Sequence, residues 1–454
     1  MLGPRARHCN RVRSSPSDGC GAHDVRPRSG DRSVLRPPWA VPGAGAPRGT
    51  CGPRGTCGPS TAVACVASVP RVSPALLRPF TVAVPDADLE DLRRRLRDTR
   101  WPERETVEDW SQGVPLAYLQ EVCATWADAY DWRAVEARLN AHEQHLATVD
   151  GLDLHVVHVP SPEPGARPLV LTHGWPGSVL EFLDVVGPLS DPVAHGGDAA
   201  DAFHVVLPSL PGYGFSGRPT GAGWGLERIA SAWVAIVEAL GYDRFLAQGG
   251  DWGSGVTHRL ATAHADRVEG IHLNLPACSP KALLALGEPT EEERGQLAKL
   301  EHYATQENGY AQEQSTKPQT VGYALADSPV GQCAWILEKF RTWTDCDGHP
   351  ENAVSRDALL DAISLYWLTN TGASSARLYW ESFGRRGPKP EPVEIPVGYT
   401  LFPEDIFAVS ERWARTRYRD LRHYSRVERG GHFAAMEQPA VFVDEVRAAF
   451  ATMR

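Results

Sequence analysis

Apolar residues recur at helical spacing early in the patterned part of the chain. In the run PDADLEDLRRRLRDTRWP, Leu89, Leu92 and Leu96 fall on one helical face. Asp86 is a suitable N-cap residue at the start of this helix, and a proline follows its end. A second helical stretch, LAYLQEVCATWADAY, comes next. The spacing therefore predicts a helical N-terminal extension over residues 78–145.

Short β-rich runs take over after this extension. The run LDLHVVHV alternates apolar and polar side chains, and PLVLTHG, FHVVLPSLPG, FLAQGGDWG, GIHLNLP and VGYTLFP add further apolar stretches. Helical segments such as LERIASAWVAIVEAL lie between several of them. Strands that alternate with helices predict the α/β class, with a mostly parallel central sheet and helices on both faces. We expect the two halves of this core at residues 146–276 and 391–454, with a helical cap inserted at 277–390.

The start of the chain has a different composition. Residues 1–75 contain eleven arginines against three aspartates, are rich in Pro, Gly and Ser, and carry the tandem repeat RGTCGP. They show neither helical nor strand periodicity. We therefore expect residues 1–77 to form a disordered tail, which is either a real part of the protein or an artefact of the assigned start site.

Charge and cysteine usage limit the partners and the compartment. A net charge of -10 at pH 7 disfavours nucleic acid as a partner. No stretch approaches the roughly 20 apolar residues that cross a bilayer, so we expect no membrane span. Five of the nine cysteines fall in the predicted tail, and the other four show no metal-ligand pattern. We interpret these four as ordinary thiols of a cytoplasmic protein: Cys123, Cys278, Cys333 and Cys346.

The run QGGDWGSG places an acid at a tight turn. An apolar strand leads directly into small residues around Asp251, and the helical segment GVTHRLATAHA follows. This order is typical of the nucleophile elbow of the α/β-hydrolase fold, in which small neighbours permit the turn that exposes one side chain. A carboxylate in this position attacks carbon and forms an ester on the enzyme. The alternative interpretation is a glycine-rich turn with a solvated aspartate.

Two further elements follow in the chain order of a catalytic triad. Glu404 and Asp405 both follow the strand VGYTLFP, and either carboxylate could orient a histidine; we prefer Asp405. His432 lies in ERGGHFAAMEQP, between a glycine pair and the start of a helix. We therefore predict Asp251 as the nucleophile, His432 as the general base and Asp405 as the orienting acid.

The run THGWPGS directly follows the strand PLVLT. In α/β hydrolases the loop after this strand and the residue after the nucleophile each supply one backbone N–H to an oxyanion hole. The predicted donors are Trp175 and Trp252. A cis bond between Trp175 and Pro176 is a further hypothesis. A tight turn without function is the alternative, which the loop LPSLPGYGFS one strand later disfavours.

The chain resembles the epoxide hydrolases, especially the microsomal and juvenile-hormone branch with its helical N-terminal extension. The runs that carry this resemblance are HGWPGS, LPGYGFSG, QGGDWGS, STKPQTVGYALADSPVG and RGGHFAAMEQP. The resemblance covers residues 78–454. It implies two cap tyrosines that donate to the epoxide oxygen, Tyr310 in ENGYAQEQSTKPQ and Tyr379 in SSARLYWESFG. It also implies a small epoxide and water as reacting partners, with neither a metal nor an organic cofactor. Because the apolar anchor helix of the membrane-bound animal relatives has no counterpart here, the chain is more similar to soluble bacterial members.

The paired tyrosines separate this interpretation from its alternatives. Opening an epoxide creates an alkoxide, so an acid must donate to the oxygen as the C–O bond breaks. A haloalkane dehalogenase also uses an aspartate nucleophile, and Trp252 could hold its halide, but such enzymes lack the paired phenols. A serine esterase is disfavoured because Ser178 and Ser254 lie away from the elbow apex. A ligand-binding protein without catalysis would be expected to lack a triad member.

The predicted cap is rich in aromatic side chains, which favours hydrophobic epoxides: Trp335, Phe340, Trp343, Tyr366 and Trp367. The same side chains are equally suited to packing the core of the cap itself. The sequence leaves both roles open, and it also leaves a homo-oligomer open.

Overall fold

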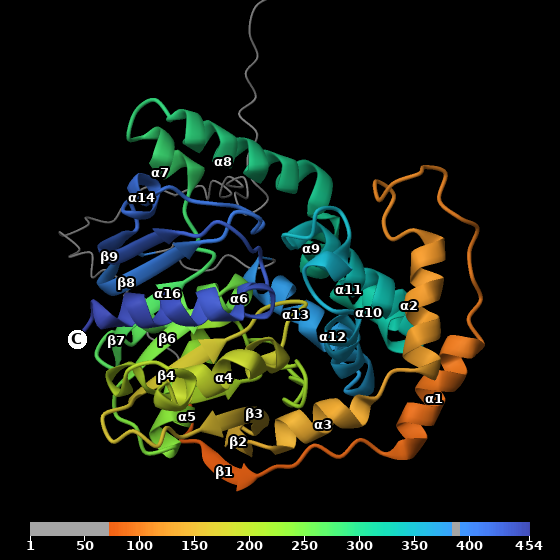
Figure 1. Ribbon diagram of the computed structural model, residues 1–454, viewed down its shortest axis with the longest axis horizontal. Helices are drawn as coiled ribbons and strands as arrows, with labels where there is room; N and C mark the ends of the chain where they lie inside the picture. Colours follow the sequence, from red (N-terminus) through yellow and green to blue (C-terminus); the bar gives the residue numbers. More distant parts are fainter. Residues whose placement is uncertain (1–71, 384–390) are drawn as a thin grey trace, which may run out of the picture. The chain divides into compact units, whose positions relative to one another are not determined.

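A nine-stranded sheet runs through the part of the chain that the structure describes (Figure 1). The structure is a computed structural model that describes residues 72–383 and 391–454, so the predicted tail up to residue 71 lies outside the described residues. The strand order is β1-β2-β3-β5-β4-β6-β7-β8-β9. Neighbouring strands from β1 to β5 pair antiparallel, and those from β5 through β4 to β9 pair parallel. The prediction of a mostly parallel sheet is confirmed.

The strands are β1 (Leu76–Pro79), β2 (Glu143–Val149), β3 (Leu152–Val159), β4 (Arg167–Thr172), β5 (Phe203–Pro208), β6 (Phe245–Gly249), β7 (Val268–Leu273), β8 (Val393–Leu401) and β9 (Tyr418–Arg426). The helices of the core and the extension are α1 (Asp86–Arg97), α2 (Leu116–Asp128), α3 (Trp132–Asn140), α4 (Leu183–Ser190), α5 (Leu226–Ala239), α6 (Asp251–Ala263), α14 (Glu411–Ala414), α15 (Ala434–Glu437) and α16 (Pro439–Ala451). The helices between β7 and β8 are α7 (Pro280–Leu284), α8 (Glu291–His302), α9 (Gly309–Thr316), α10 (Pro318–Asp327), α11 (Pro329–Trp343), α12 (Arg356–Leu368) and α13 (Gly372–Ser382).

Both faces of the sheet are buried, because successive side chains of a strand point to opposite sides. On β3, Val156 belongs to the apolar cluster that contains Trp233 of α5, whereas Val157 belongs to the cluster that contains Val446 of α16. Helices α5 and α6 pack together on one side, and α4 and α16 pack together on the other. This two-sided covering explains why the core strands are apolar runs rather than strictly alternating ones.

A helical insertion, defined as α7–α13, separates β7 from β8 and lies within the predicted cap range. Helices α1 and α2 of the N-terminal extension pack against α11 of this insertion (Figure 1). The indole N–H of Trp126 on α2 donates to the buried Ser364 hydroxyl on α12 at 2.8 Å. The extension therefore supports the insertion directly.

Three local features differ from the sequence predictions. Strand β1 begins at Leu76, so the last residues of the predicted tail belong to the sheet. Helix α1 has Pro85 as its N-cap, and Asp86 is its first residue without a capping hydrogen bond; the carboxylate still lies in the first turn, where the helix dipole favours it. Strand β2 starts at Glu143, before the predicted boundary.

In residues 72–383 and 391–454, no helix combines the length and apolarity needed to cross a bilayer.

Candidate active site

Asp251 stands at the turn between β6 and α6. Its φ is 48°, a left-handed conformation that is rare for a residue with a side chain. The turn closes only because its neighbours are glycines: a Cβ on Gly249 would collide with the backbone of Gly253, and a Cβ on Gly253 would collide with the carbonyl of Thr172. The predicted elbow is therefore present, and it projects the Asp251 carboxylate from the end of the sheet.

The loop after β4 reaches over this carboxylate. The backbone N–H of Trp175 donates to Oδ1 of Asp251 at 2.8 Å. The Trp175–Pro176 bond is cis, as predicted. Trp252 follows Asp251 in the first turn of α6, where backbone N–H groups have no acceptor within the helix. The two predicted oxyanion donors therefore flank the acid, and the Trp175 amide already binds it.

His432 lies between two carboxylates. Its Nε2 is 3.4 Å from Oδ2 of Asp251, and its Nδ1 is 2.7 Å from Oδ1 of Asp405. Asp405 is buried, whereas the neighbouring Glu404 has a half-exposed side chain and forms an ion pair with Lys299 at 3.7 Å. The structure thus brings Asp251, His432 and Asp405 together and turns Glu404 away.

The two neighbouring carboxylates determine the protonation state of His432. Burial by itself lowers the pKa of His432, but the negative charges of Asp405 and Asp251 outweigh burial and raise the pKa to about 10. The resting site is therefore an imidazolium between two carboxylates. Removing the charge of either carboxylate would lower the pKa of His432 again.

The two predicted tyrosines come from the helical insertion, Tyr310 on α9 and Tyr379 on α13. Their ring centroids are 5.7 Å apart, and both side chains are buried. Tyr310 stacks on Trp175 with centroids 4.9 Å apart, and Tyr379 meets Trp252 edge-on at 4.7 Å. Burial raises the pKa of both phenols well above their ordinary value, and the Asp251 charge acts in the same direction. Both phenols are consequently neutral hydrogen-bond donors.

Comparisons with known proteins agree with this arrangement. A family model described as Epoxide hydrolase N terminus matches residues 77–182, and one described as alpha/beta hydrolase fold matches residues 167–334. A Stigmatella aurantiaca protein whose name places it among epoxide hydrolases is 53% identical over 380 residues, which cover 83% of this chain and 86% of that protein. Epoxide hydrolase 1 of Sus scrofa is 36% identical over 398 residues, which cover 82% and 88%. The chain belongs to the epoxide hydrolase family.

Solved structures of this family share the fold. The juvenile hormone epoxide hydrolase of Bombyx mori matches with a TM-score of 0.75 and 29% identity, over 84% of this chain and 95% of that one. The Aspergillus niger epoxide hydrolase matches with a TM-score of 0.74 and 32% identity, over 84% and 97%. The predicted α/β-hydrolase fold and the resemblance to epoxide hydrolases are confirmed, and the protein is a hydrolase.

This epoxide hydrolase has a third tyrosine that the sequence analysis missed. The hydroxyl of Tyr303 lies 2.9 Å from the hydroxyl of Tyr310 and shares a hydrogen bond with it. Tyr303 begins a π-helical turn, Tyr303–Glu307, between α8 and α9. Its spacing of seven residues from Tyr310 corresponds to two helical turns, which was the available signal. Tyr303 holds the orientation of the Tyr310 hydroxyl.

A cavity beside the nucleophile contains a second residue that the sequence analysis missed. Its lining includes Asp251, His432, Trp175 and Glu181, but neither Tyr310 nor Tyr379. Glu181 follows Ser178 at the spacing of a capping box, S-x-x-E, and that signature was the available signal. The cavity therefore adds a carboxyl group to the site from the loop after β4.

One group of side chains in the described ranges has the composition of a metal site. Glu143, His145 and His158 offer ligand atoms within 4.8 Å of one another on β2 and β3. Nε2 of His145 already faces Glu143 at 3.0 Å, and Nε2 of His158 lies 3.0 Å from the Tyr242 hydroxyl. These protein contacts account for the cluster, which shares no residue with the triad.

Proposed function

We propose that the enzyme converts hydrophobic epoxides and water to vicinal diols through an ester on Asp251. The observation that carries this proposal is the surroundings of the Asp251 carboxylate. The Trp175 N–H and the His432 imidazolium contact it, and the neutral phenols of Tyr310 and Tyr379 pack against the neighbouring Trp175 and Trp252 rings. The haloalkane dehalogenase and the non-catalytic binding protein gain no support from the relatives described above, which are epoxide hydrolases by name.

The first half-reaction joins the substrate to the enzyme. Oδ1 of Asp251 is held by the Trp175 amide, so Oδ2, which faces Nε2 of His432 at 3.4 Å, is the oxygen that attacks a ring carbon. As the C–O bond of the epoxide breaks, Tyr310 and Tyr379 donate hydrogen bonds and then a proton to the new alkoxide. Oδ1 becomes the carbonyl oxygen of the ester, already placed beside its oxyanion donors.

The second half-reaction releases the diol. Esterification removes the negative charge of Asp251, which is one of the charges that raise the pKa of His432. His432 then loses its proton, which restores the phenol that protonated the alkoxide, and accepts another proton from the water that attacks the ester carbon. The oxyanion donors Trp175 and Trp252 stabilise the resulting tetrahedral intermediate by on the order of 3 kcal/mol. His432 returns the proton to the departing diol oxygen, and no cofactor takes part in these steps.

We further propose a cytoplasmic location and no nucleic-acid partner. The four cysteines in the described ranges are unpaired, which is typical of proteins in a reducing compartment. The net charge of -10 would repel a phosphate backbone.

The role of Asp251 is tested by Asp251→Ala. We expect diol formation from styrene oxide to fall by at least roughly 10⁴-fold, because the nucleophile is lost. Asp243→Ala is a matched control, since that side chain is 92% exposed at the surface, and it should retain full activity. Diol formation that survives in Asp251→Ala would reject the covalent route.

A further inference from the structure

Two capping boxes in the described part of the chain place glutamates in different surroundings. At the 3-10 turn Val179–Phe182, Oε1 of Glu181 accepts the backbone N–H of Ser178 at 2.9 Å. At the start of α8, Oε2 of Glu293 accepts the backbone N–H of Thr290 at 2.9 Å. Because the local motif is the same, any difference between the two carboxyl groups reflects what surrounds them.

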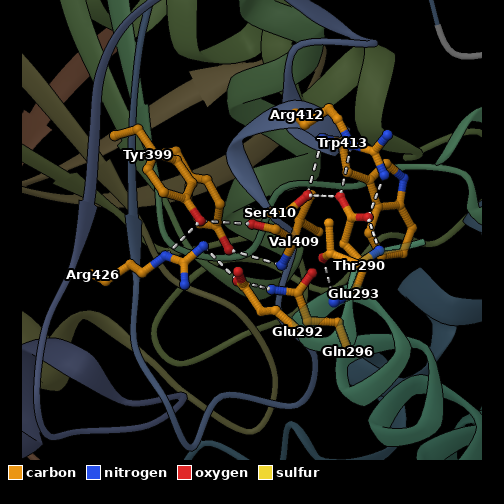
Figure 2. A network of polar contacts seen from close by, with 11 residues as sticks. Thr290, Glu292, Glu293, Gln296, Tyr399, Val409, Ser410, Arg412, Trp413 and Arg426 are labelled. Carbon is orange, nitrogen blue, oxygen red and sulfur yellow. Dashed lines mark hydrogen bonds and ion pairs between the residues drawn. The ribbon is translucent and has the colours of Figure 1, made fainter. Parts of the chain in front are cut away.

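Glu293 is fully satisfied as a structural residue. Figure 2 shows its carboxylate in a network with Arg412 and Ser410. The Ser410 hydroxyl donates to Oε1 at 2.7 Å, and the Arg412 guanidinium binds both oxygens. Hydrogen bonds from Arg412, ahead of all other causes, lower the pKa of Glu293 to about 2. This carboxylate is therefore charged at neutral pH, and both of its oxygens accept hydrogen bonds.

Glu181 has no such partners. Within the residues that the structure describes, its carboxyl group has the Ser178 amide as its hydrogen-bond donor and no ion pair. Burial raises the pKa of Glu181 to about 8, which the nearby His432 opposes and Asp251 reinforces. A carboxyl group that titrates near neutrality next to a nucleophile has the properties of a catalytic group rather than those of a helix cap alone.

The Glu181 side chain faces the cavity beside Asp251. Glu181 lines this cavity together with Asp251 and His432, and part of its surface stays accessible. A side chain on Gly177 would collide with the Glu181 carboxyl group, so the glycine at 177 is what admits it. The carboxyl group thus reaches the cavity from the chain segment that also supplies the Trp175 amide.

Other polar atoms around this cavity also lack partners. Gln248 donates its amide to Asn274 at 2.5 Å, but Oε1 of Gln248 and Nδ2 of Asn274 are buried without hydrogen bonds to described residues. Both residues line the same cavity. Buried polar groups of this kind are normally satisfied by ordered water. The cavity therefore offers polar atoms that can bind an ordered water, beside apolar side chains such as Phe182 and Phe442.

We infer that Glu181 binds the hydrolytic water and, with His432, aims it at the ester carbon of Asp251. The inference rests on the proposed function. One hydrogen of the water points to Nε2 of His432, and the other points to the Glu181 carboxylate. As the water oxygen bonds to Cγ of Asp251, His432 takes one proton, the bond from Cγ to the alkyl oxygen breaks, and the diol oxygen takes the proton back. Glu181 neither gains nor loses a proton in this step.

Several ionisable groups surround Glu181 and bear on its titration. They are Asp251 on α6, His432 after β9, Tyr366 on α12 and His173 in the loop after β4. Glu437 on α15, which packs against the same 3-10 turn, accepts the backbone N–H groups of Asp345 and Phe433 at 2.9 Å each. Burial raises its pKa to about 7, so a pH profile alone does not separate it from Glu181. A Glu181 variant does.

The experiment measures both half-reactions by rapid-quench single turnover of styrene oxide in the full-length enzyme, its Glu181→Gln variant and a Glu293→Gln control. Glutamine keeps the oxygen that accepts the Ser178 amide, so the cap is retained. We expect Glu181→Gln to form the ester at a rate within about threefold of the wild type, but to hydrolyse it roughly 10- to 100-fold more slowly. The wild-type hydrolysis rate should rise with pH through an inflection as the Glu181 carboxylate forms, and Glu181→Gln should lack this inflection. Glu293→Gln should retain both rates.

Each other outcome has a defined consequence. Ester hydrolysis at the wild-type rate in Glu181→Gln would overturn the inference, as would an equal loss of both half-reactions. If the variant does not fold, a wild-type hydrolysis rate that is flat between pH 7 and 9 still contradicts a titrating Glu181. A wild type that forms no ester at all would instead contradict the proposed function.

Discussion

The sheet and the helical insertion meet at Asp251 with opposite electrical character. The ends of the parallel strands contribute three ionisable groups: His432 and the two carboxylates on either side of it, Asp251 at 3.4 Å and Asp405 at 2.7 Å. The insertion contributes neutral phenols, Tyr310 and Tyr379, which burial keeps protonated. In the proposed mechanism, nucleophilic attack and ester hydrolysis therefore depend on the sheet, whereas protonation of the epoxide oxygen depends on the insertion. The two half-reactions should respond to different substitutions.

The largest effect should come from the sheet. Asp405→Asn removes the charge that holds and polarises His432, and we expect ester hydrolysis to slow by roughly 10³- to 10⁴-fold. Glu404→Gln, the adjacent control, should stay within about twofold because Glu404 pairs with Lys299 instead. Rapid-quench measurement of ester decay distinguishes them. If Glu404→Gln slows ester decay more than Asp405→Asn does, the assignment of Asp405 is contradicted.

A smaller effect should come from the insertion and should fall on the other half-reaction. We expect Tyr310→Phe and Tyr379→Phe each to slow ester formation by roughly 10-fold and the double variant by roughly 10³-fold, because one phenol partly substitutes for the other. Ester decay should change by less than about threefold. Stopped-flow tryptophan fluorescence can follow both phases, since Trp175 and Trp252 contact these rings. A double variant that forms ester as fast as either single variant would remove the phenols from the mechanism.

The smallest effect concerns how the insertion is fixed to the sheet side. Glu293 on α8 binds Ser410 and Arg412 in the segment that follows Asp405 (Figure 2). Its pKa is lowered to about 2, so its contribution to stability is complete above the ordinary glutamate value of 4.5 and is lost as the pH falls toward 2. Glu293→Gln should lower the Tm by a few degrees, roughly 2–4 °C, at pH 7. The difference between the two proteins in thermal unfolding should shrink between pH 4.5 and 2; a constant difference would contradict the pairing.

The sequence predicted the parts of the site that lie in short runs with fixed neighbours. Asp251 could be recognised because a tight turn needs the glycines around it, and Trp175 because its loop directly follows a strand. His432 could be recognised because it comes last in the chain order of the triad. The α/β class followed from strands that alternate with helices.

Other parts depend on contacts between distant segments, which no local pattern records. Glu404 and Asp405 follow the same strand, but the Asp405 carboxylate contacts His432 whereas that of Glu404 faces Lys299. Tyr303 matters only because a π-helical turn brings its hydroxyl to Tyr310. The sequence around Glu181 shows only a helix-capping pattern, and it is the fold that brings Glu181 to the cavity lined by Asp251 and His432.

The most direct test of the central claim is mass spectrometry of the His432→Gln variant after incubation with styrene oxide. Without its general base the enzyme should complete the first half-reaction and stop, so the peptide that contains Asp251 should gain the mass of one substrate molecule. The same peptide in Asp251→Ala should remain unmodified. If the His432→Gln enzyme carries no adduct, or carries it on another residue while the wild type still makes diol, a covalent intermediate on Asp251 is contradicted.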